Sequence, residues 1–287
     1  KLLVDANSRI SLSNNDSGSQ NTIFGHSAGA SLDDGSNYNT FFGYQVSDGS
    51  MADAGYNTGV GHNALGGLTS GEYNTAVGQL AGSAISSGGG NVCIGRVSGN
   101  TMDTSGSNTL VGYSTGSSIA TGQTTTDGTT AVGYNALGAL TSGEGNVAIG
   151  YQALDASTDS DFNTAVGYSA LTAQTGSSGN VSNTAVGHQC GLGITKGRYN
   201  TIMGRLALAS EDVGDFSTAI GYYALYSQNS DSDNETTGNT GLGVQTGYYN
   251  VTGQNNTYVG YAAGQGVSGK SHSGCVFIGT NAGLTAY

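Results

Sequence analysis

The sequence predicts an all-β fold: a parallel β-solenoid, or β-roll, of about fifteen coils of about 17 residues each. The first observation is repetition, because the nine-residue phrase NTAVGYSAL at 163–171 recurs in fifteen variants almost from end to end. The second is the period, since a unit of 17 residues cannot enclose its own core and must stack on its neighbours. The third is the glycine content, 51 of 287 residues, which leaves no apolar stripe at helical spacing. The copies begin at residues 21, 39, 57, 74, 91, 108, 129, 146, 163, 183, 200, 217, 239, 256 and 275.

Aligning the copies predicts the elements of one coil in order. The second residue is Thr or Val and the fourth is always apolar, so both lie on one face of a short strand. We predict that this face is buried. The fifth residue is always Gly, which permits a sharp bend after the strand. The eighth is always small, Ala in ten copies, and is predicted to begin a second short strand before a Gly-containing turn.

The first residue of the phrase is Asn in twelve copies. Stacked coils place these side chains one above another at the spacing of neighbouring strands, where each amide can bond to the next. We therefore predict a structural asparagine ladder, rather than a ligand site, that satisfies polar groups at a turn. The ladder consists of Asn21, Asn39, Asn57, Asn74, Asn91, Asn108, Asn146, Asn163, Asn183, Asn200, Asn239 and Asn256.

The sixth residue, directly after the bend glycine, is Tyr or His in ten copies. Its side chain is expected to be at least partly exposed, so that a file of aromatic rings follows the stacked coils. Such a file can stack on sugar rings or on a partner protein. The alternative interpretation is that the rings only cover the bend. The candidate surface-binding ladder is Tyr44, Tyr113, Tyr134, Tyr151, Tyr168, Tyr222, Tyr261, His26, His62 and His188.

Composition excludes several classes of protein. The net charge is −12 with only seven Lys and Arg residues, which argues against a nucleic-acid partner and against binding to an anionic membrane surface. No stretch approaches 18 consecutive apolar residues, so no membrane insertion is expected. Pro is absent and Gly does not recur at every third residue, which excludes collagen. We predict one repeat domain, with a leading strand or N-terminal coil at 1–20 and a β-roll shaft at 21–287.

The sequence supplies no set of catalytic residues. Cys93, Cys190 and Cys275 are odd in number and irregularly spaced, which fits no disulfide framework and no zinc site, and we expect them to be small buried residues. No Ser-His-Asp grouping and no carboxylate pair can be assembled, so we expect neither an enzyme nor a cofactor. The segment GQGVSGKS at 264–271 matches a P-loop pattern. The residues after it start another coil rather than a helix, so nucleotide binding is not predicted.

Three longer spacings insert extra residues at about every third coil. The inserts fall near 117–128, 172–182 and 226–238. Repeat proteins commonly keep binding loops at such positions. The third insert contains Asp231, Asp233 and Glu235, whose alternating carboxylates can hold calcium. The glycine and the closing Glu of a calcium loop are lacking, so a solvated acidic loop is the favoured interpretation.

The repeat resembles known fibre proteins. Phrases such as GYQAL and TSGEGNVAIG, with the opening SRISLSNNDSG at 8–18, resemble the repeat regions of bacteriophage tail fibres. The repeat is also similar to the head domain of trimeric autotransporter adhesins, whose units carry a related Asn-Ser/Thr-apolar-Ala-Ile-Gly phrase but have a shorter period. The resemblance implies a homotrimer of left-handed parallel β-rolls wound around a common axis. Such tail fibres often end in an intramolecular chaperone domain of the endosialidase type, which has no counterpart in these residues.

The favoured function is a structural and attachment protein of the virion: a phage tail-fibre shaft whose surface binds a host glycan or protein. Two alternatives remain open, a bacterial trimeric adhesin head at the cell surface and a tailspike that degrades glycans. A fourth candidate is an ice-binding solenoid, in which a flat array of Thr matches the ice lattice. We disfavour it because the Thr at the second place is expected to share the buried face, and because the inserts would interrupt a flat surface.

Overall fold

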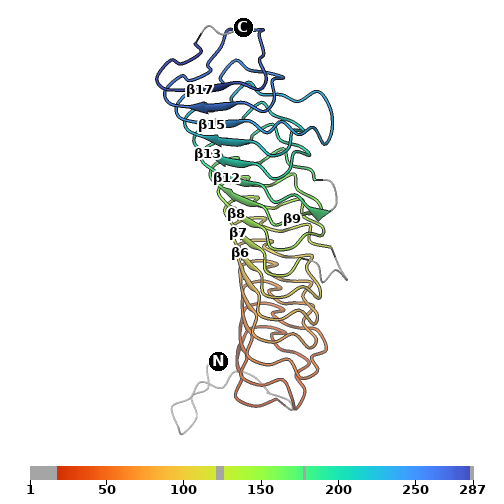
Figure 1. Cartoon of the computed structure of the whole chain (residues 1–287). Helices are drawn as coiled ribbons and strands as arrows, with labels where there is room; N and C mark the ends of the chain where they lie inside the picture. The colour runs from red at the N-terminus through yellow and green to blue at the C-terminus, as the bar shows by residue number, and fades with distance from the viewer. Residues whose placement is uncertain (1–17, 121–125, 177–178, 285–287) are drawn as a thin grey trace. The chain divides into compact units, whose positions relative to one another are not determined.

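The computed structural model describes residues 18–120, 126–176 and 179–284, which form stacked coils joined by parallel β-strands (Figure 1). Contacts within the chain divide it into two compact units, Lys1–Thr129 and Thr130–Tyr287. We call them the N-terminal and C-terminal units. The described residues contain no helix, and hence none that could cross a membrane. The coils number about fifteen with a spacing of about 17 residues, so the predicted all-β parallel solenoid is confirmed. The predicted leading strand at 1–20 lies outside the described residues, except for 18–20.

The N-terminal unit contains one three-residue strand in each coil. Its strands are β1 (Thr22–Phe24), β2 (Thr40–Phe42), β3 (Thr58–Val60), β4 (Thr75–Val77), β5 (Val92–Ile94) and β6 (Thr109–Val111). Each strand begins at the second residue of the phrase and pairs in parallel with the next, so that equivalent residues face each other; Thr22, for example, is opposite Thr40. The register of the sheet is therefore the register of the sequence repeat.

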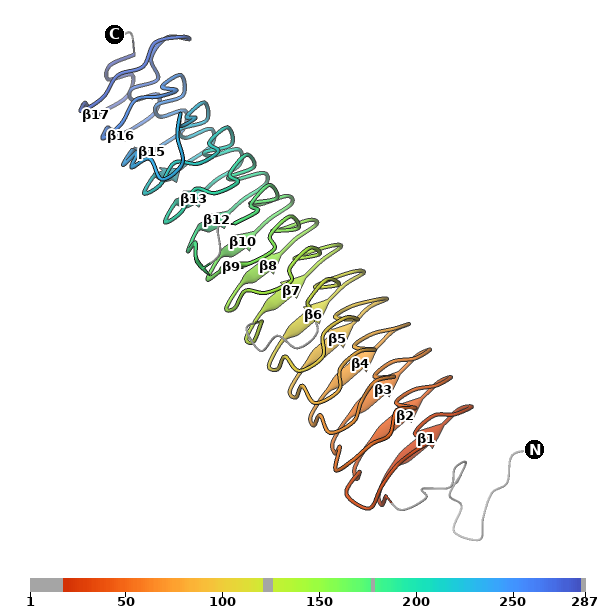
Figure 2. The same cartoon turned by 90° about the vertical axis from the view of Figure 1, so that its right-hand side faces the viewer.

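The C-terminal unit continues the same pattern. Its ladder consists of β7 (Thr130–Val132), β8 (Val147–Ile149), β10 (Thr164–Val166), β12 (Thr184–Val186), β13 (Thr201–Met203), β14 (Thr218–Ile220), β15 (Thr240–Leu242), β16 (Thr257–Val259) and β17 (Val276–Ile278). Neighbours in this order pair in parallel, as Figure 2 shows strand by strand. Two short strands outside the ladder, β9 (Ser160–Asp161) and β11 (Gly179–Asn180), pair with each other, and β9 lies across the coils from the ladder (Figure 1).

The core is built on the third residue of each phrase, and our prediction that the second and fourth residues are buried is wrong. In β10 the third residue, Ala165, is fully buried, whereas Thr164 and Val166 on either side are partly exposed. The alternation of a strand makes the second and fourth residues share a face, but it does not say which face is inside. The narrow interior of the coil determines which face points inward, because it has little room for large side chains. A Cβ added at Gly59, for example, would lie 2.5 Å from Cγ1 of Val46. The coil therefore takes mostly small third residues inward and turns the larger fourth residues out.

The eighth residue is buried as expected, but it does not begin a second strand. After the bend glycine the chain runs through successive turns, because the seventh and ninth residues adopt left-handed backbone conformations. In the coil of β3 these are Asn63 at φ 53° and Leu65 at φ 54°, values that a strand does not allow. Ala64 between them, and Leu65 itself, are fully buried. One strand and a run of turns, rather than two strands, thus enclose each layer of the core.

The cysteines follow the core pattern only in part. All three are free thiols, and Cys93 and Cys190 are buried, which raises the pKa of each thiol to about 12. Cys275 is half-exposed, which contradicts the expectation that it is buried. It takes the first place of the last copy of the phrase, and no further copy stacks on it within the described residues.

Candidate interaction surfaces

The outward side of the strand ladder is uncharged in every coil. We call it the strand face and define it as the second and fourth residues of the fifteen copies. All of these are Thr, Val or other apolar residues, although the chain carries 19 Asp and Glu residues. Phe42 and Met203 are 53% and 49% exposed, and Phe24 stacks on Phe42 with ring centroids 4.8 Å apart. A contiguous exposed apolar stripe of this kind typically marks an interaction surface.

The threonine hydroxyls of the strand face are left for solvent or a partner. In the described part of the C-terminal unit, the hydroxyls of Thr164, Thr184 and Thr201 have no hydrogen-bond partner. The backbone of each strand is fully engaged with its neighbours, so these side chains are not needed to satisfy it. The strand face therefore combines a row of free hydroxyls with a row of apolar side chains.

The sixth residues form the file of side chains that the sequence predicted, and all ten Tyr and His members are exposed. We call this the sixth-residue file. In the N-terminal unit His26, Tyr44 and His62 stack in succession, with centroids 5.5 and 5.4 Å apart. Farther along the same unit the Arg96 guanidinium lies 5.4 Å from the ring of Tyr113 and donates a hydrogen bond of 2.8 Å to its hydroxyl.

In the C-terminal unit the file contains a longer stack of rings. Tyr134, Tyr151, Tyr168 and His188 follow one another at centroid distances of 5.1, 4.9 and 5.3 Å. Beyond them Arg205 lies over Tyr222, and Tyr261 is the most exposed tyrosine of the file at 55%. Stacking of this kind stabilises neighbouring coils and at the same time leaves ring edges and hydroxyls accessible.

A second aromatic file, which sequence reasoning missed, occupies the residue just before the phrase. Tyr38, Tyr56 and Tyr73 stack with centroids 4.8 and 5.0 Å apart in the N-terminal unit. Tyr199 and Phe216 stack at 5.1 Å in the C-terminal unit. The sequence contains the pattern that predicts this file, because an aromatic residue directly precedes the phrase in these copies. The nine-residue phrase starts one residue later and therefore does not include it.

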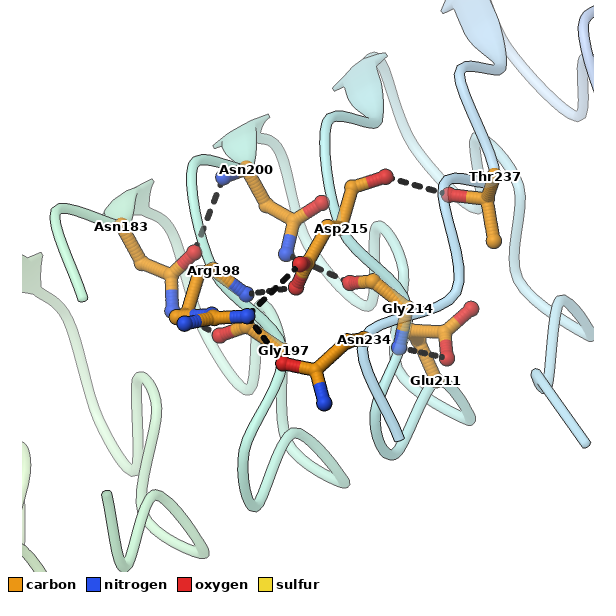
Figure 3. A network of polar contacts seen from close by, with 9 residues as sticks. All are labelled: Asn183, Gly197, Arg198, Asn200, Glu211, Gly214, Asp215, Asn234 and Thr237. Carbon is orange, nitrogen blue, oxygen red and sulfur yellow. Dashed lines mark hydrogen bonds and ion pairs between the residues drawn. The ribbon is translucent and has the colours of Figure 1, made fainter. Parts of the chain in front are cut away.

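The asparagines at the first place lie inside the coil and brace it in two directions. The Asn74 side-chain oxygen accepts the backbone N–H of Asn91 at 3.0 Å, and its amide group donates across the coil to the Gly88 carbonyl at 2.9 Å. Figure 3 shows the same pattern at Asn183, which accepts from the Asn200 N–H at 2.9 Å. The bond that recurs at every ladder asparagine is thus donated by a backbone N–H to the side-chain oxygen, and direct bonds between two side-chain amides accompany only some of them.

The same geometry places all the predicted members of the ladder. In each of them the side-chain Oδ1 accepts a hydrogen bond from the backbone N–H of the first residue of the next copy. These acceptors are Asn21, Asn39, Asn57, Asn74, Asn91, Asn108, Asn146, Asn163, Asn183, Asn200, Asn239 and Asn256. Eleven of the twelve are buried, and Asn21, in the first coil described, is half-buried. An interior position of this kind supports the coil and offers nothing to a ligand.

The third insert is fixed to the coils by charged side chains. Arg198 donates to Asp215 from its backbone N–H at 2.7 Å and from its guanidinium at 3.3 Å, and it also bonds to Asn234 in the insert (Figure 3). Lys196 pairs with Asp233 at 2.6 Å, and this contact raises the pKa of the exposed lysine. The insert is therefore an ordered element of the surface.

A buried carboxylate holds the start of the same insert. One oxygen of Glu211 accepts three consecutive backbone N–H groups, ending at Gly214, and a fourth from Ser230. Its other oxygen accepts the side-chain amide of Gln228 at 2.8 Å. All of these partners are neutral donors, so hydrogen bonds rather than a cation hold the Glu211 side chain in place.

Two of the three carboxylates that we considered for calcium are engaged within the protein. Asp233 pairs with Lys196, and Glu235 accepts from Gln254 and from the Asp231 N–H at 3.0 Å; Asp231 takes part through its backbone. Across the described residues no group of three or more His, Cys, Asp and Glu side chains is placed to hold a metal ion. The geometry gives no support to calcium at this insert, and we do not propose it.

A buried histidine closes the last coils of the C-terminal unit. His272 Nε2 lies 2.8 Å from the hydroxyl of Tyr258, whose ring fills a core position, and Phe277 packs edge-on against the imidazole. Nδ1 of His272 is buried and has no hydrogen-bond partner. Burial lowers the pKa of His272 and raises that of Tyr258. His272 therefore belongs to the packing of the coil.

The P-loop-like segment lies in the same region and has no helix after it. Residues 264–271 consist of turns and irregular chain, and the Ser271 hydroxyl accepts the backbone N–H groups of Val251 and Thr252. The hydroxyl that a P-loop would turn toward a metal ion therefore supports a neighbouring coil.

Comparisons with protein-family models, with curated proteins and with solved structures found no match to this chain.

Proposed function

We propose that this chain is a segment of a fibrous structural and attachment protein, of the kind found in phage tail fibres, that assembles as a homotrimer through the strand face. The observation that carries the proposal is that the fourth residue of the phrase, apolar in all fifteen copies, lies outside the coil. A side chain that the core does not need, yet that is always apolar, is best explained by burial against another chain. A second copy offers the same uncharged surface at the same coil spacing.

The dimensions of the strand face set what it contributes to this assembly. The three residues of each strand span about 10 Å at about 3.3 Å per residue, so the nine coils of the C-terminal ladder, at about 4.8 Å per coil, present roughly 430 Å². A stable interface buries about 800 Å² on each partner, so the strand face of this unit supplies about half of that area. Because the face carries no charge, pairing it with copies of itself does not bring the acidic residues of a chain with net charge −12 together.

Attachment is proposed for the surfaces outside the strand face. The sixth-residue file and the ordered insert at 226–238 present tyrosine hydroxyls, imidazoles and acidic groups to solvent, as a host glycan or a host protein would require. We place the protein in the virion, with the cell-surface adhesin as the alternative location. No catalytic step is proposed, and release of reducing sugar from host polysaccharide would favour the tailspike instead.

Sedimentation equilibrium of the 287-residue chain tests the assembly. The expected mass is three times the 28.6 kDa of one chain, with trimers that resist SDS in unheated samples. A monomeric mass would refute the proposed fibre.

Ice binding is a second candidate function, because the structure removes one ground for disfavouring it. The Thr at the second place faces outward, and of the inserts the second, which contains β11, pairs with β9 outside the ladder. The varied size of the fourth residues, from Val166 to Phe42, makes the face uneven, so we rank this candidate below the trimer. A monomer that shows thermal hysteresis and loses it in Thr164→Lys would establish ice binding.

A further inference from the structure

Five tyrosines form one aromatic cluster on two neighbouring coils of the C-terminal unit. We call Tyr222, Tyr223, Tyr226, Tyr248 and Tyr249 the tyrosine cluster. Tyr226 and Tyr248 stack with centroids 5.1 Å and planes 14° apart, and Tyr223 meets them edge-on at 4.9 and 5.7 Å. Tyr249 lies edge-on to Tyr248 at 4.7 Å, and Tyr222 edge-on to Tyr223 at 4.2 Å. The rings therefore form a continuous surface with two ring orientations.

The coil does not need these rings in order to fold. Tyr226 and Tyr248 take the tenth place of their copies, where most other copies have small or polar residues such as Ser83, Ser117 and Thr172, and two have Leu. Both rings are half-exposed and lie outside the core. Aromatic residues that are concentrated on one surface, at a place where no other copy has an aromatic residue, indicate a binding role more than a structural one.

The cluster also lies apart from the strand face. Its members follow β14 and β15 in the turn segments beyond the bend glycines. The insert at 226–238 begins within the cluster, and the exposed Asn229 stands three residues after Tyr226. The rings thus stay accessible when strand faces associate, and polar side chains lie beside them.

This chemistry suits a sugar ring. The C–H face of a pyranose packs on an aromatic ring, while its hydroxyls bond to tyrosine hydroxyls and to neighbouring amides. The net charge of −12 disfavours an anionic glycan. We propose that the tyrosine cluster binds a neutral oligosaccharide built of hexopyranose units, an inference that depends on the proposed function because it assigns the attachment surface to this site.

Binding of three neutral polysaccharides, dextran, mannan and galactan, to the immobilised 287-residue chain tests the site. At least one of them is expected to bind. The double variant Tyr226→Ser/Tyr248→Ser, which introduces the residue found at the tenth place of other copies, is expected to weaken binding by about tenfold or more. The matched control Tyr199→Ser removes an exposed, stacked ring from the second aromatic file, to which no attachment role is assigned, and is expected to leave binding unchanged.

The proposed site would be overturned if the chain bound none of the three polysaccharides, or if the wild type and the double variant bound them equally. Stronger binding of polyglucuronate than of the neutral probes would also overturn it. Circular dichroism verifies that the double variant is folded; if it is not, Tyr249→Ser decides in the same way. The mass of the same samples separates the two proposals. A trimer that binds none of the probes refutes the site alone, whereas a monomer whose binding depends on the cluster refutes the assembly alone.

Discussion

At the scale of single residues, the bend glycine is the most constrained position in the repeat. Gly167 has a φ of +144°, and a Cβ added there would lie 2.2 Å from the carbonyl oxygen of Gly187 in the next coil. Glycine is therefore required for two reasons: the backbone conformation at the bend and the close approach of the next coil. Because the bend recurs wherever one coil stacks on the next, the fifth place of the phrase is Gly in every copy.

Replacing Gly167 with Ala is expected to lower the free energy of unfolding by about 3 kcal/mol, since backbone must move to admit the methyl group. The loss is measured as a lowered midpoint of thermal unfolding by circular dichroism. Gly274→Asn serves as the control, because no atom lies within 4 Å of a Cβ added there and Asn255 occupies the same place in the preceding copy at φ 56°. Equal midpoints for the two variants would contradict the steric account.

The asparagine ladder gives a second prediction at this scale. Asn163→Ala removes the acceptor of the buried Asn183 N–H, a bond of 3.0 Å, and is expected to cost about 2 kcal/mol of unfolding free energy. Chemical denaturation measures the loss. The control Asn229→Ala, on the exposed part of the third insert, should leave the free energy of unfolding unchanged. A similar loss in both variants would show that the ladder bond contributes no stability of its own.

At the scale of the element, the repeat determined the strand and its register but not its orientation. The phrase located each strand, the bend and the buried eighth residue, because period and residue size depend on the sequence alone. Which face of Thr164–Val166 points inward depends on the narrow interior that the facing turn leaves, and that is a property of the closed coil. The second strand was wrongly predicted because left-handed residues such as Leu65 are not recognisable as turn residues from their identity.

The candidate sites also divide into those that the sequence predicts and those that only the folded chain reveals. The outward file of Tyr44 and its equivalents follows from an exposed place after a bend, and the sequence was sufficient to find it. The tyrosine cluster joins Tyr226 to Tyr248 across coils with an insert between them, so their contact required the folded chain. The engagement of Asp233 by Lys196 was equally hidden, because 37 residues separate the two.

The buried His272 predicts a pH dependence of the last coils. Because burial lowers its pKa in the folded chain, the unfolded chain takes up the proton first, so stability is constant above about pH 6.5 and falls below it. Thermal midpoints at pH 7.5 and 5.5 are expected to differ more in the wild type than in His272→Gln, in which carboxylate titration is the same. An identical shift in the two proteins would show that His272 does not contribute.

At the scale of the whole molecule, the feature that matters most for function is which residues of the phrase face the core and which face outward, since it is repeated from coil to coil. The core uses the third, eighth and ninth residues, and the uncharged second and fourth residues remain outside in both units. Within a single chain this exposure is unfavourable, because apolar side chains such as Phe42 and Met203 remain in water. Association through the strand face removes them from water, whereas the insert at 226–238 and the tyrosine cluster lie on other walls of the coil.

The most direct test of this account is the mass of a chain whose strand face has been charged. In Val166→Glu/Val186→Glu, two outward residues of neighbouring coils become acidic; the control Asn229→Glu/Ser232→Glu adds the same charge to the exposed insert. Sedimentation equilibrium is predicted to give a folded monomer for the first variant and a trimer for the control and the wild type. A folded trimer in the strand-face variant, or a monomeric wild type, would contradict the account.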